Sequence, residues 1–387
     1  MNGRRIVWLD CLRAVAVSLV LWGHIFLVGM NDPTTVSVWL PSVRDFIFGP
    51  GSASRNPHSA VSVFMWTYTG TGPGGLGVAL FFLISGFVIL RTIDRTSPAM
   101  FLARRFFRIV PVCAVVTLAT AIGTNMAYTE AGLTSPNTIV SVIAASLALS
   151  RLLQQFETIP VLWTLSAEVM FYLVIAGTAW IVGGRIGLRV LAGLSLACLT
   201  GVLLVRSPVF AETLSADLAS RAIYLSRLLV YVSFMLIGAV AYRGYAEQRL
   251  VPALRWGSMC CLTSALTYFE FTALNRVHIG IWPAEAAFAL LVFFAAFALD
   301  LRGSWTRPLR WVADLSYPLY LVHTPLGWAI LVWLAARGWS MMPAGLLSTF
   351  AVVFVAWIVH VAIEKPGYSI GRALGFHKLG LPAAQLP

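Results

Sequence analysis

Charged residues are scarce in this chain of 387 residues: Asp, Glu, Lys and Arg together make up only 11% of it. Hydrophobic residues make up 59%, and the mean hydropathy is +0.84. A soluble globular domain of this length cannot bury so much apolar surface. The composition therefore excludes an ordinary soluble domain and predicts a polytopic membrane protein.

Cysteine and lysine are also rare. The five cysteines all fall within apolar segments and lack the spacing of metal ligands, so we expect neither a disulfide framework nor a metal site. Only two of the 27 basic residues are lysine, which fits a GC-rich bacterial genome. Because the basic residues are scattered between apolar runs, the net charge of +12 indicates membrane topology, and we expect no nucleic-acid partner.

Apolar stretches long enough to cross a membrane recur along the chain, and one further stretch, 138–153, is at the lower edge of the required length. If 138–153 turns back without crossing, 19 of the 27 basic residues lie on the side of the N-terminus; if it crosses, the two sides hold 14 and 13. The positive-inside rule therefore predicts a re-entrant or interfacial 138–153 and cytoplasmic termini. The ten predicted spans are residues 8–29, 75–93, 109–128, 163–182, 187–205, 226–243, 256–274, 283–300, 315–336 and 343–363.

These patterns predict an all-α polytopic membrane helix bundle of about ten transmembrane helices. Residues 1–370 form a single transmembrane domain, and residues 371–387 form a short cytoplasmic tail. The longest loop, 31–73, is rich in Gly, Pro, Ser and Thr and lies on the outer face. We expect the protein in the inner (plasma) membrane of a bacterium, in contact with the lipid bilayer.

Three polar residues interrupt the first apolar run: Asp10, Arg13 and His24. On a straight helix Arg13 and His24 lie at about −60° and −40° from Asp10, so the three form one stripe. Ionisable side chains in a membrane cost roughly 2.5–3.5 kcal/mol each and normally face a bundle interior or a watery cavity. The interruptions, and the lack of a cleavage site after His24, also favour a retained helix over a signal peptide. The stripe is therefore the first candidate site.

Each member of the stripe also has a structural interpretation. Asp10 and Arg13 are three residues apart and can neutralise each other as an ion pair that fixes helix packing. His24 can be a packing histidine that is hydrogen-bonded to a neighbouring helix. Arg13 and His24 are about 16 Å apart along the axis and cannot touch.

Several motifs, in order along nearly the whole chain, are similar to those of the acyltransferase-3 family of integral-membrane O-acyltransferases. The first is Leu-Asp-Cys-Leu-Arg-Ala-Val-Ala at 9–16, and Arg13 to His24 matches the family's Arg-x10-His spacing. The others are Gly-Val-Ala-Leu-Phe-Phe-Leu-Ile-Ser-Gly-Phe at 77–87, Ala-Arg-Arg-Phe-Phe-Arg-Ile-Val-Pro at 103–111, Trp-Thr-Leu-Ser-Ala-Glu-Val-Met-Phe-Tyr at 163–172, Leu-Ser-Tyr-Pro-Leu-Tyr-Leu-Val-His at 315–323 and Glu-Lys-Pro at 364–366.

The resemblance implies transfer of an acyl group, usually acetyl, from acyl-coenzyme A to a hydroxyl of a sugar or related acceptor, without a metal. A neutral imidazole can take the hydroxyl proton as the oxygen attacks the thioester, so we predict His24 as the catalytic base. Glu168 is the second predicted catalytic residue. Its carboxylate could orient an imidazole or accept a hydrogen bond from the acceptor, or it could simply be a favourable charge near a helix N-terminus.

The remaining candidates are assigned to donor binding or to supporting roles. Guanidinium groups bind phosphate oxygens bidentately, so Arg104, Arg105 and Arg108 are predicted to hold coenzyme A, although a topology signal also explains them. Ser85 is placed in the same donor site. Ser316, Tyr320 and His323 form a one-sided polar stripe that we expect to line the same cavity, with Asp10 and Arg13 as further supporting residues. His360 and Glu364 share a helix face and are predicted to be a structural pair.

The sequence leaves the acceptor open. The predicted partner is a hydroxyl-bearing glycan or glycosylated acceptor, such as an envelope polysaccharide or oligosaccharide, and the alternative within the same enzyme class is a secondary metabolite such as a macrolide. A proton-coupled transporter is the alternative of another class, because intramembrane His, Asp and Arg can relay protons. The absence of inverted repeats counts against a transporter.

Overall fold

The computed structural model of the protein describes residues 5–28, 36–41, 72–207, 210, 213–275, 281, 283–299 and 303–376. Within these ranges there are helices and turns but no β-strand, which confirms the predicted all-α class. Most of the predicted outer loop 31–73 lies outside the described residues. The helices are α1 (Val7–Leu21), η1 (Trp22–Val28), α6 (Pro73–Ile93), α7 (Pro98–Glu130), α8 (Ile139–Ser146), α9 (Leu162–Ile181), α10 (Leu188–Arg206), α12 (Ala216–Glu247), α13 (Leu250–Asn275), α14 (Pro283–Leu299), η5 (Ser304–Thr306), α15 (Arg307–Asp314), α16 (Ser316–Ala335), α17 (Met341–Val359), η6 (His360–Glu364) and α18 (Lys365–Phe376).

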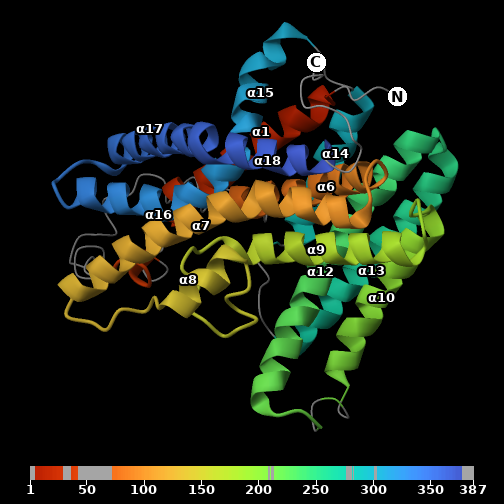
Figure 1. Ribbon diagram of the computed structural model, residues 1–387, viewed down its shortest axis with the longest axis horizontal. Helices are drawn as coiled ribbons and strands as arrows, with labels where there is room; N and C mark the ends of the chain where they lie inside the picture. Colours follow the sequence, from red (N-terminus) through yellow and green to blue (C-terminus); the bar gives the residue numbers. More distant parts are fainter. Residues whose placement is uncertain are drawn as a thin grey trace.

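In its described residues, each of the ten apolar stretches named from the sequence lies within these helices, to within one or two residues at either end. Within the described residues, eight helices are long and apolar enough to cross a membrane, and the chain is therefore a multi-pass membrane protein. The other two stretches form α13 and α14, and α14, with 17 residues, is at the lower limit for a crossing. Figure 1 shows these helices gathered into one bundle.

The segment 138–153 does not cross the bundle. Only eight of its residues are helical, in α8, which begins at a capping box formed by Thr138 and Ser141. A helix of eight residues is about 12 Å long, far short of a hydrocarbon core of about 30 Å. A chain reversal follows, in which Ala148 and Gln154 adopt positive φ angles. Figure 1 shows α8 lying beside α7, as expected for the predicted re-entrant or interfacial segment.

Helix α7 begins eleven residues before the predicted span 109–128. Ser97 caps it by accepting a hydrogen bond from the backbone N–H of Met100, and Pro98 occupies its first turn. The basic run of the third motif is therefore helical rather than a loop. Hydropathy marks only the apolar part of a helix, and a helix of 33 residues can extend beyond the membrane core. At the C-terminus, α18 likewise continues to Phe376, past the predicted start of the tail at residue 371.

Helix α6 is central to the bundle and packs closely against α1 and α12. At the α6–α12 crossing a Cβ on Gly238 would overlap the Leu83 carbonyl, and a Cβ on Gly86 would overlap the Met235 carbonyl. Membrane helices approach this closely only through small residues. The N-terminus of α6 is also fixed, because Glu285 of α14 accepts a hydrogen bond of 2.6 Å from the backbone N–H of Gly72.

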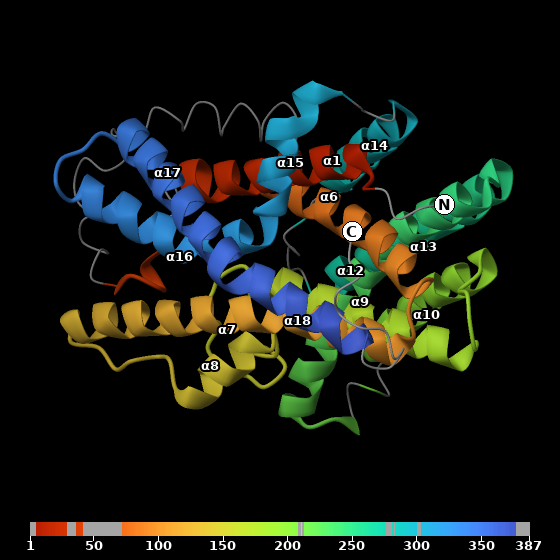
Figure 2. The ribbon, with the colours of Figure 1, turned by 45° about the horizontal axis from the view of Figure 1, so that its top comes forward.

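Ion pairs join the loops that the charge count placed on one side of the membrane. Arg243 at the end of α12 binds Asp94 after α6 through two nitrogens, at 2.8 and 2.9 Å, and Arg185 lies 3.8 Å from the same carboxylate. Arg243 is fully buried, and α18 packs beside the first half of α7 in both views (Figures 1 and 2). The loops after α6, α9 and α12 therefore meet at one end of the bundle, as the topology prediction requires.

Candidate active site

A cavity lies among helices α1, α6, α7, α9 and α16. It encloses about 890 Å³ of empty space, part of it open to the surroundings, and small-molecule sites typically measure roughly 300–1,000 Å³. Seven of the eleven predicted site residues line it. These are Arg13, Ser85, Arg105, Arg108, Glu168, Ser316 and Tyr320.

Three guanidinium groups line this cavity, and among the described residues that line it Glu168 is the only carboxylate. Arg13 lies 3.6 Å from Asp10 on the preceding turn of α1. Arg105 is held in place by a 3.3 Å hydrogen bond to the Thr92 hydroxyl and by the Tyr172 ring, whose centroid is 5.2 Å away. The cavity is therefore positively charged, and this charge favours an anionic ligand.

Arg108 differs from the other two arginines because, in the described part of the chain, it has no hydrogen bond or ion pair. The carboxylates of Glu364 and Glu168 attract its charge, but neither forms an ion pair with it, so its N–H groups are left to a ligand or water. Its guanidinium is therefore free to bind phosphate or carboxylate oxygens bidentately.

Glu168 projects from α9 towards α6. Its Oε1 accepts hydrogen bonds from the Tyr172 hydroxyl at 2.6 Å and the Ser85 hydroxyl at 3.3 Å. No contact joins Glu168 to His24 within the described residues, so the interpretation of this carboxylate as the group that orients the imidazole is wrong for this structure. Its Oε2 has no partner in the same part of the chain. The role of Glu168 as an acceptor of a substrate hydrogen bond stays a prediction.

Tyr320 lies at the end of the cavity nearest the histidines. Its hydroxyl is 2.7 Å from the Thr164 hydroxyl of α9, and its ring packs against Phe81 of α6. On the other side its ring lies 5.5 Å from that of His323. Tyr320 therefore separates the arginine-lined cavity from the histidines, and Ser316, one turn earlier on α16, lines the cavity as predicted.

His24 and His323 form a direct pair beyond Tyr320. Nε2 of His323 lies 3.2 Å from Nδ1 of His24, and the ring centroids are 4.9 Å apart. Neither imidazole is among the residues that line the cavity, so the expectation that His323 lines it is corrected: this side chain contacts the predicted base instead. The structure gives His323 the place beside His24 that the sequence analysis considered for Glu168.

The backbone at His24 is a π-helix, η1, which follows α1 directly. A Cβ added to Gly23 would lie 2.7 Å from the backbone nitrogen of Gly74, so α1 and α6 touch at this point. The indole N–H of Trp328 donates a 2.8 Å hydrogen bond to the His24 carbonyl. Single π-turns inside membrane or soluble helices often mark functional sites. Because the turn is wider than an α-turn, the straight-helix angle that places His24 on the Asp10 stripe does not hold beyond Leu21.

An aromatic layer packs against the histidine pair. The Trp328 ring, 1% exposed, lies 6.0 Å from the Trp39 ring, which packs against Phe156. The indole N–H of Trp39 donates a hydrogen bond of 3.0 Å to the Glu157 carbonyl. Burial raises the pKa of the Glu157 side chain, and the neighbouring Arg151 acts in the opposite direction. This layer holds the segment before α9 against the end of η1.

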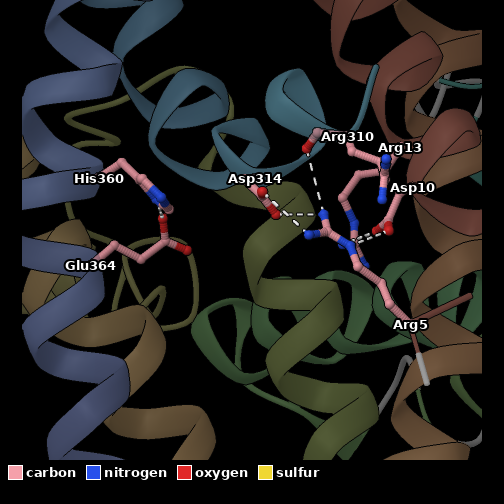
Figure 3. Close-up of polar contacts among 7 residues, drawn as sticks. All are labelled: Arg5, Asp10, Arg13, Arg310, Asp314, His360 and Glu364. Carbon is pink, nitrogen blue, oxygen red and sulfur yellow. Dashed lines mark hydrogen bonds and ion pairs between the residues drawn. The ribbon is translucent and has the colours of Figure 1, made fainter. Parts of the chain in front are cut away.

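Asp10 lies outside the cavity and is held between two arginines, Arg13 and Arg5. The Arg5 guanidinium contacts Asp10 and also binds Asp314 of α15 at 2.6 Å (Figure 3). Arg5 further approaches the backbone carbonyl of Arg310. This network favours the structural interpretation of Asp10, because its charge is neutralised by contacts that fasten the start of α1 to α15.

Two predictions for residues near α18 have opposite outcomes. His360 and Glu364 form the predicted pair, with Nδ1 of His360 2.6 Å from Oε2 of Glu364 (Figure 3). Arg104, in contrast, does not line the cavity. Its backbone is close to Gly371 of α18. By helix geometry Arg104 and Arg108, four residues apart, point only about 40° apart, so the spacing alone did not separate Arg104 from the cavity-lining arginines.

Sequence reasoning missed Thr164 and Tyr317, which also line the cavity. Thr164 is one turn before Glu168 on α9, so its place on the same face was readable from the spacing. Tyr317 donates a 2.8 Å hydrogen bond to the Ile109 carbonyl of α7. It lies next to Ser316 in the motif, and only the packing of α16 against α7 reveals its position.

Comparison with known proteins agrees with this architecture. The sequence model of the family described as "Acyltransferase domain" matches residues 6–361. The chain is 30% identical over 318 residues to the exopolysaccharide production protein ExoZ of Rhizobium meliloti, covering 78% of this chain and 91% of that protein. No solved structure matches the chain at a significant level.

Proposed function

We propose a specific reaction for this chain, which belongs to the acyltransferase-3 family of membrane O-acyltransferases: transfer of an acetyl group from acetyl-coenzyme A to a carbohydrate hydroxyl. Membership of the family makes the protein an O-acyltransferase. The donor, the acyl group, the acceptor and the bacterial inner membrane as its location are parts of the proposal.

The observation that carries the proposal is the guanidinium of Arg108, which has no hydrogen bond or ion pair among the described residues, in a cavity that also contains Arg13 and Arg105. Coenzyme A has a diphosphate and a 3′-phosphate, and arginine clusters are well suited to bind such groups. Arg105 and Arg108 lie in the half of α7 that begins at the cytoplasmic end, where the soluble donor is available. The nucleotide would bind there, and the pantetheine arm would extend past Glu168 towards Tyr320.

The chemistry is assigned to His24. The acceptor hydroxyl gives its proton to Nε2 of His24 as its oxygen attacks the thioester carbonyl carbon. The C–S bond then breaks, and the thiolate of coenzyme A takes the proton from the imidazolium. The products are the O-acyl ester and coenzyme A with a free thiol, so the base returns to its neutral form. For this reaction the thioester must pass Tyr320, which lies between the cavity and the histidine pair.

A carbohydrate acceptor is supported by the similarity to a protein whose name refers to exopolysaccharide production. The position of His24 is consistent with this assignment. It lies at the far end of α1 from Arg5 and Asp10, on the side of the bundle where a sugar chain bound for the exterior can be reached. We therefore assign the acceptor to the class of exopolysaccharides and their oligosaccharide units.

Acyl transfer by purified protein in lipid nanodiscs tests this proposal. Acetyl-coenzyme A and exopolysaccharide oligosaccharides are supplied together; thiol release is followed with a chromogenic reagent and the oligosaccharides are analysed by mass spectrometry. We expect acceptor-dependent thiol release and oligosaccharides that are heavier by one acetyl group. Thiol release that does not depend on the acceptor, or an unchanged oligosaccharide mass, would contradict the proposal.

A further inference from the structure

The histidine pair joins two helices that are far apart in the chain, since His24 and His323 are 299 residues apart. His323 is fully buried, and both of its ring nitrogens are engaged. Its Nδ1 lies 2.6 Å from the carbonyl oxygen of Tyr320, and its Nε2 lies 3.2 Å from Nδ1 of His24. Nδ1 of His24 is also 3.0 Å from the Val20 carbonyl oxygen.

These contacts determine which nitrogens carry hydrogen. A carbonyl oxygen can only accept, so Nδ1 of His323 is the donor to Tyr320, and Nε2 of a neutral His323 is an acceptor. Nδ1 of His24 then faces two acceptors, the Val20 carbonyl and Nε2 of His323, and must carry a hydrogen. A neutral His24 therefore has its lone pair on Nε2, which has no hydrogen-bond partner within the residues described.

We propose that His323 is a positioning residue for catalysis: it holds the His24 ring with Nε2 directed at the acceptor and stabilises the imidazolium that forms there. This inference rests on the proposed function, in which Nε2 of His24 takes the hydroxyl proton. When that proton arrives, the His24 Nδ1–H bond to His323 becomes a hydrogen bond from a cation and gains strength. His323 neither gains nor loses a proton in the cycle, because the added proton leaves Nε2 of His24 for the thiolate.

The arrangement serves the purpose that a carboxylate serves beside the histidine of a Ser-His-Asp triad, but with a neutral partner. A carboxylate is costly to bury in an apolar bundle because it is charged, whereas a second, neutral imidazole held by the backbone carbonyl of Tyr320 carries no charge. The pair is also rigid, because Trp328 fixes the backbone of His24 and the carbonyls of Val20 and Tyr320 fix the two rings.

Two substitutions at His323 separate positioning from packing. His323→Gln keeps an oxygen acceptor near the place of Nε2, whereas His323→Leu has a similar size and no acceptor. For His323→Leu we expect kcat to fall about 10- to 100-fold, as for the loss of one hydrogen bond to a charged group, with KM for acetyl-coenzyme A unchanged. His323→Gln should recover most of the lost kcat.

Thr324→Val is the matched control, because Thr324 is the buried neighbour of His323 and its hydroxyl has no partner in the described part of the chain. We expect wild-type kcat and thermal stability for this variant. If His323→Leu keeps the wild-type kcat, or if Leu and Gln lose activity equally with an equal loss of thermal stability, the positioning role is overturned. Activity in His24→Ala would instead contradict the proposed function itself, so the two failures are distinguishable.

Discussion

At the scale of single residues, the arginines of α7 show how one basic motif divides between two roles. Arg105 and Arg108 line the cavity, whereas Arg104 does not, and its backbone lies against Gly371 of α18. All three are equivalent by composition and by proximity in sequence. Only the packing of α7 against α9 and α18 decides which of the three arginines line the cavity.

This division predicts different kinetics for two matched variants. Arg108→Gln removes a cavity-lining guanidinium, so KM for acetyl-coenzyme A should rise at least tenfold, as expected for the loss of about 1.5–3 kcal/mol of charge-assisted hydrogen bonding. Arg104→Gln should leave KM within about twofold of the wild-type value. Steady-state kinetics in nanodiscs, repeated with dephospho-coenzyme A esters, measure both effects. Equal rises in KM for the two variants would contradict the assignment.

The candidate residues themselves were largely readable from the sequence, because intramembrane charges and polar stripes are rare enough to be noticed. The contacts that these residues make could not be predicted from the sequence. The His24–His323 pair joins residues that no local spacing relates, and Glu168 binds Ser85 and Tyr172 instead of an imidazole. Contacts between helices depend on the rotation of each helix about its axis and on its depth in the bundle, and hydropathy encodes neither.

At the scale of helices, close approach through glycine fixes the bundle around α6. Gly238 of α12 faces the Leu83 carbonyl so closely that no side chain fits between the two helices. Gly23 and Gly74 allow a similar close approach of η1 to α6, at the π-turn of η1. The helices were predicted from their apolar composition to within a few residues for α6 and α9. The long extension of α7, and the π-turn, were not, because both depend on capping and packing rather than on hydropathy.

A glycine pair therefore tests the packing account. Gly238→Ala should destabilise the protein by about 1–3 kcal/mol through overpacking against the α6 backbone. Gly177→Ala in α9 is the control, because a Cβ there meets nothing within 4 Å. Thermal melts of the detergent-solubilised variants should show a lowered midpoint for Gly238→Ala alone. A midpoint equal to that of the wild type in Gly238→Ala would show that the α6–α12 crossing is looser than described.

At the scale of the whole molecule, one group of ion pairs joins loops at one end of the bundle. Asp94, Arg185 and Arg243 join three loops there, and Arg5 joins the start of α1 to Asp314. These are the loops that the distribution of basic residues assigned to the cytoplasm. This topology requires that 138–153 does not cross the membrane. The eight-residue α8 is too short to cross it, as the topology requires.

Labelling with a membrane-impermeant maleimide tests the orientation in intact cells. Ser135→Cys lies on the exposed segment before α8, and Arg249→Cys lies on the exposed turn between α12 and α13. We expect the first to be labelled from outside and the second only after permeabilisation. The unmodified chain is the control, because four of its cysteines are buried and Cys261 is only partly exposed. Labelling of both variants from outside would contradict the predicted topology.

The central claim is that His24 is the base of an acyl transfer from coenzyme A. A single-turnover experiment tests it most directly: wild type and His24→Ala in nanodiscs, with enzyme in excess over radiolabelled acetyl-coenzyme A and with oligosaccharide acceptor present. Loss of a general base typically lowers the rate about 10²- to 10⁴-fold. We predict such a loss for His24→Ala with acetyl-coenzyme A binding unchanged by filter assay; near-normal transfer of label by His24→Ala would contradict the account.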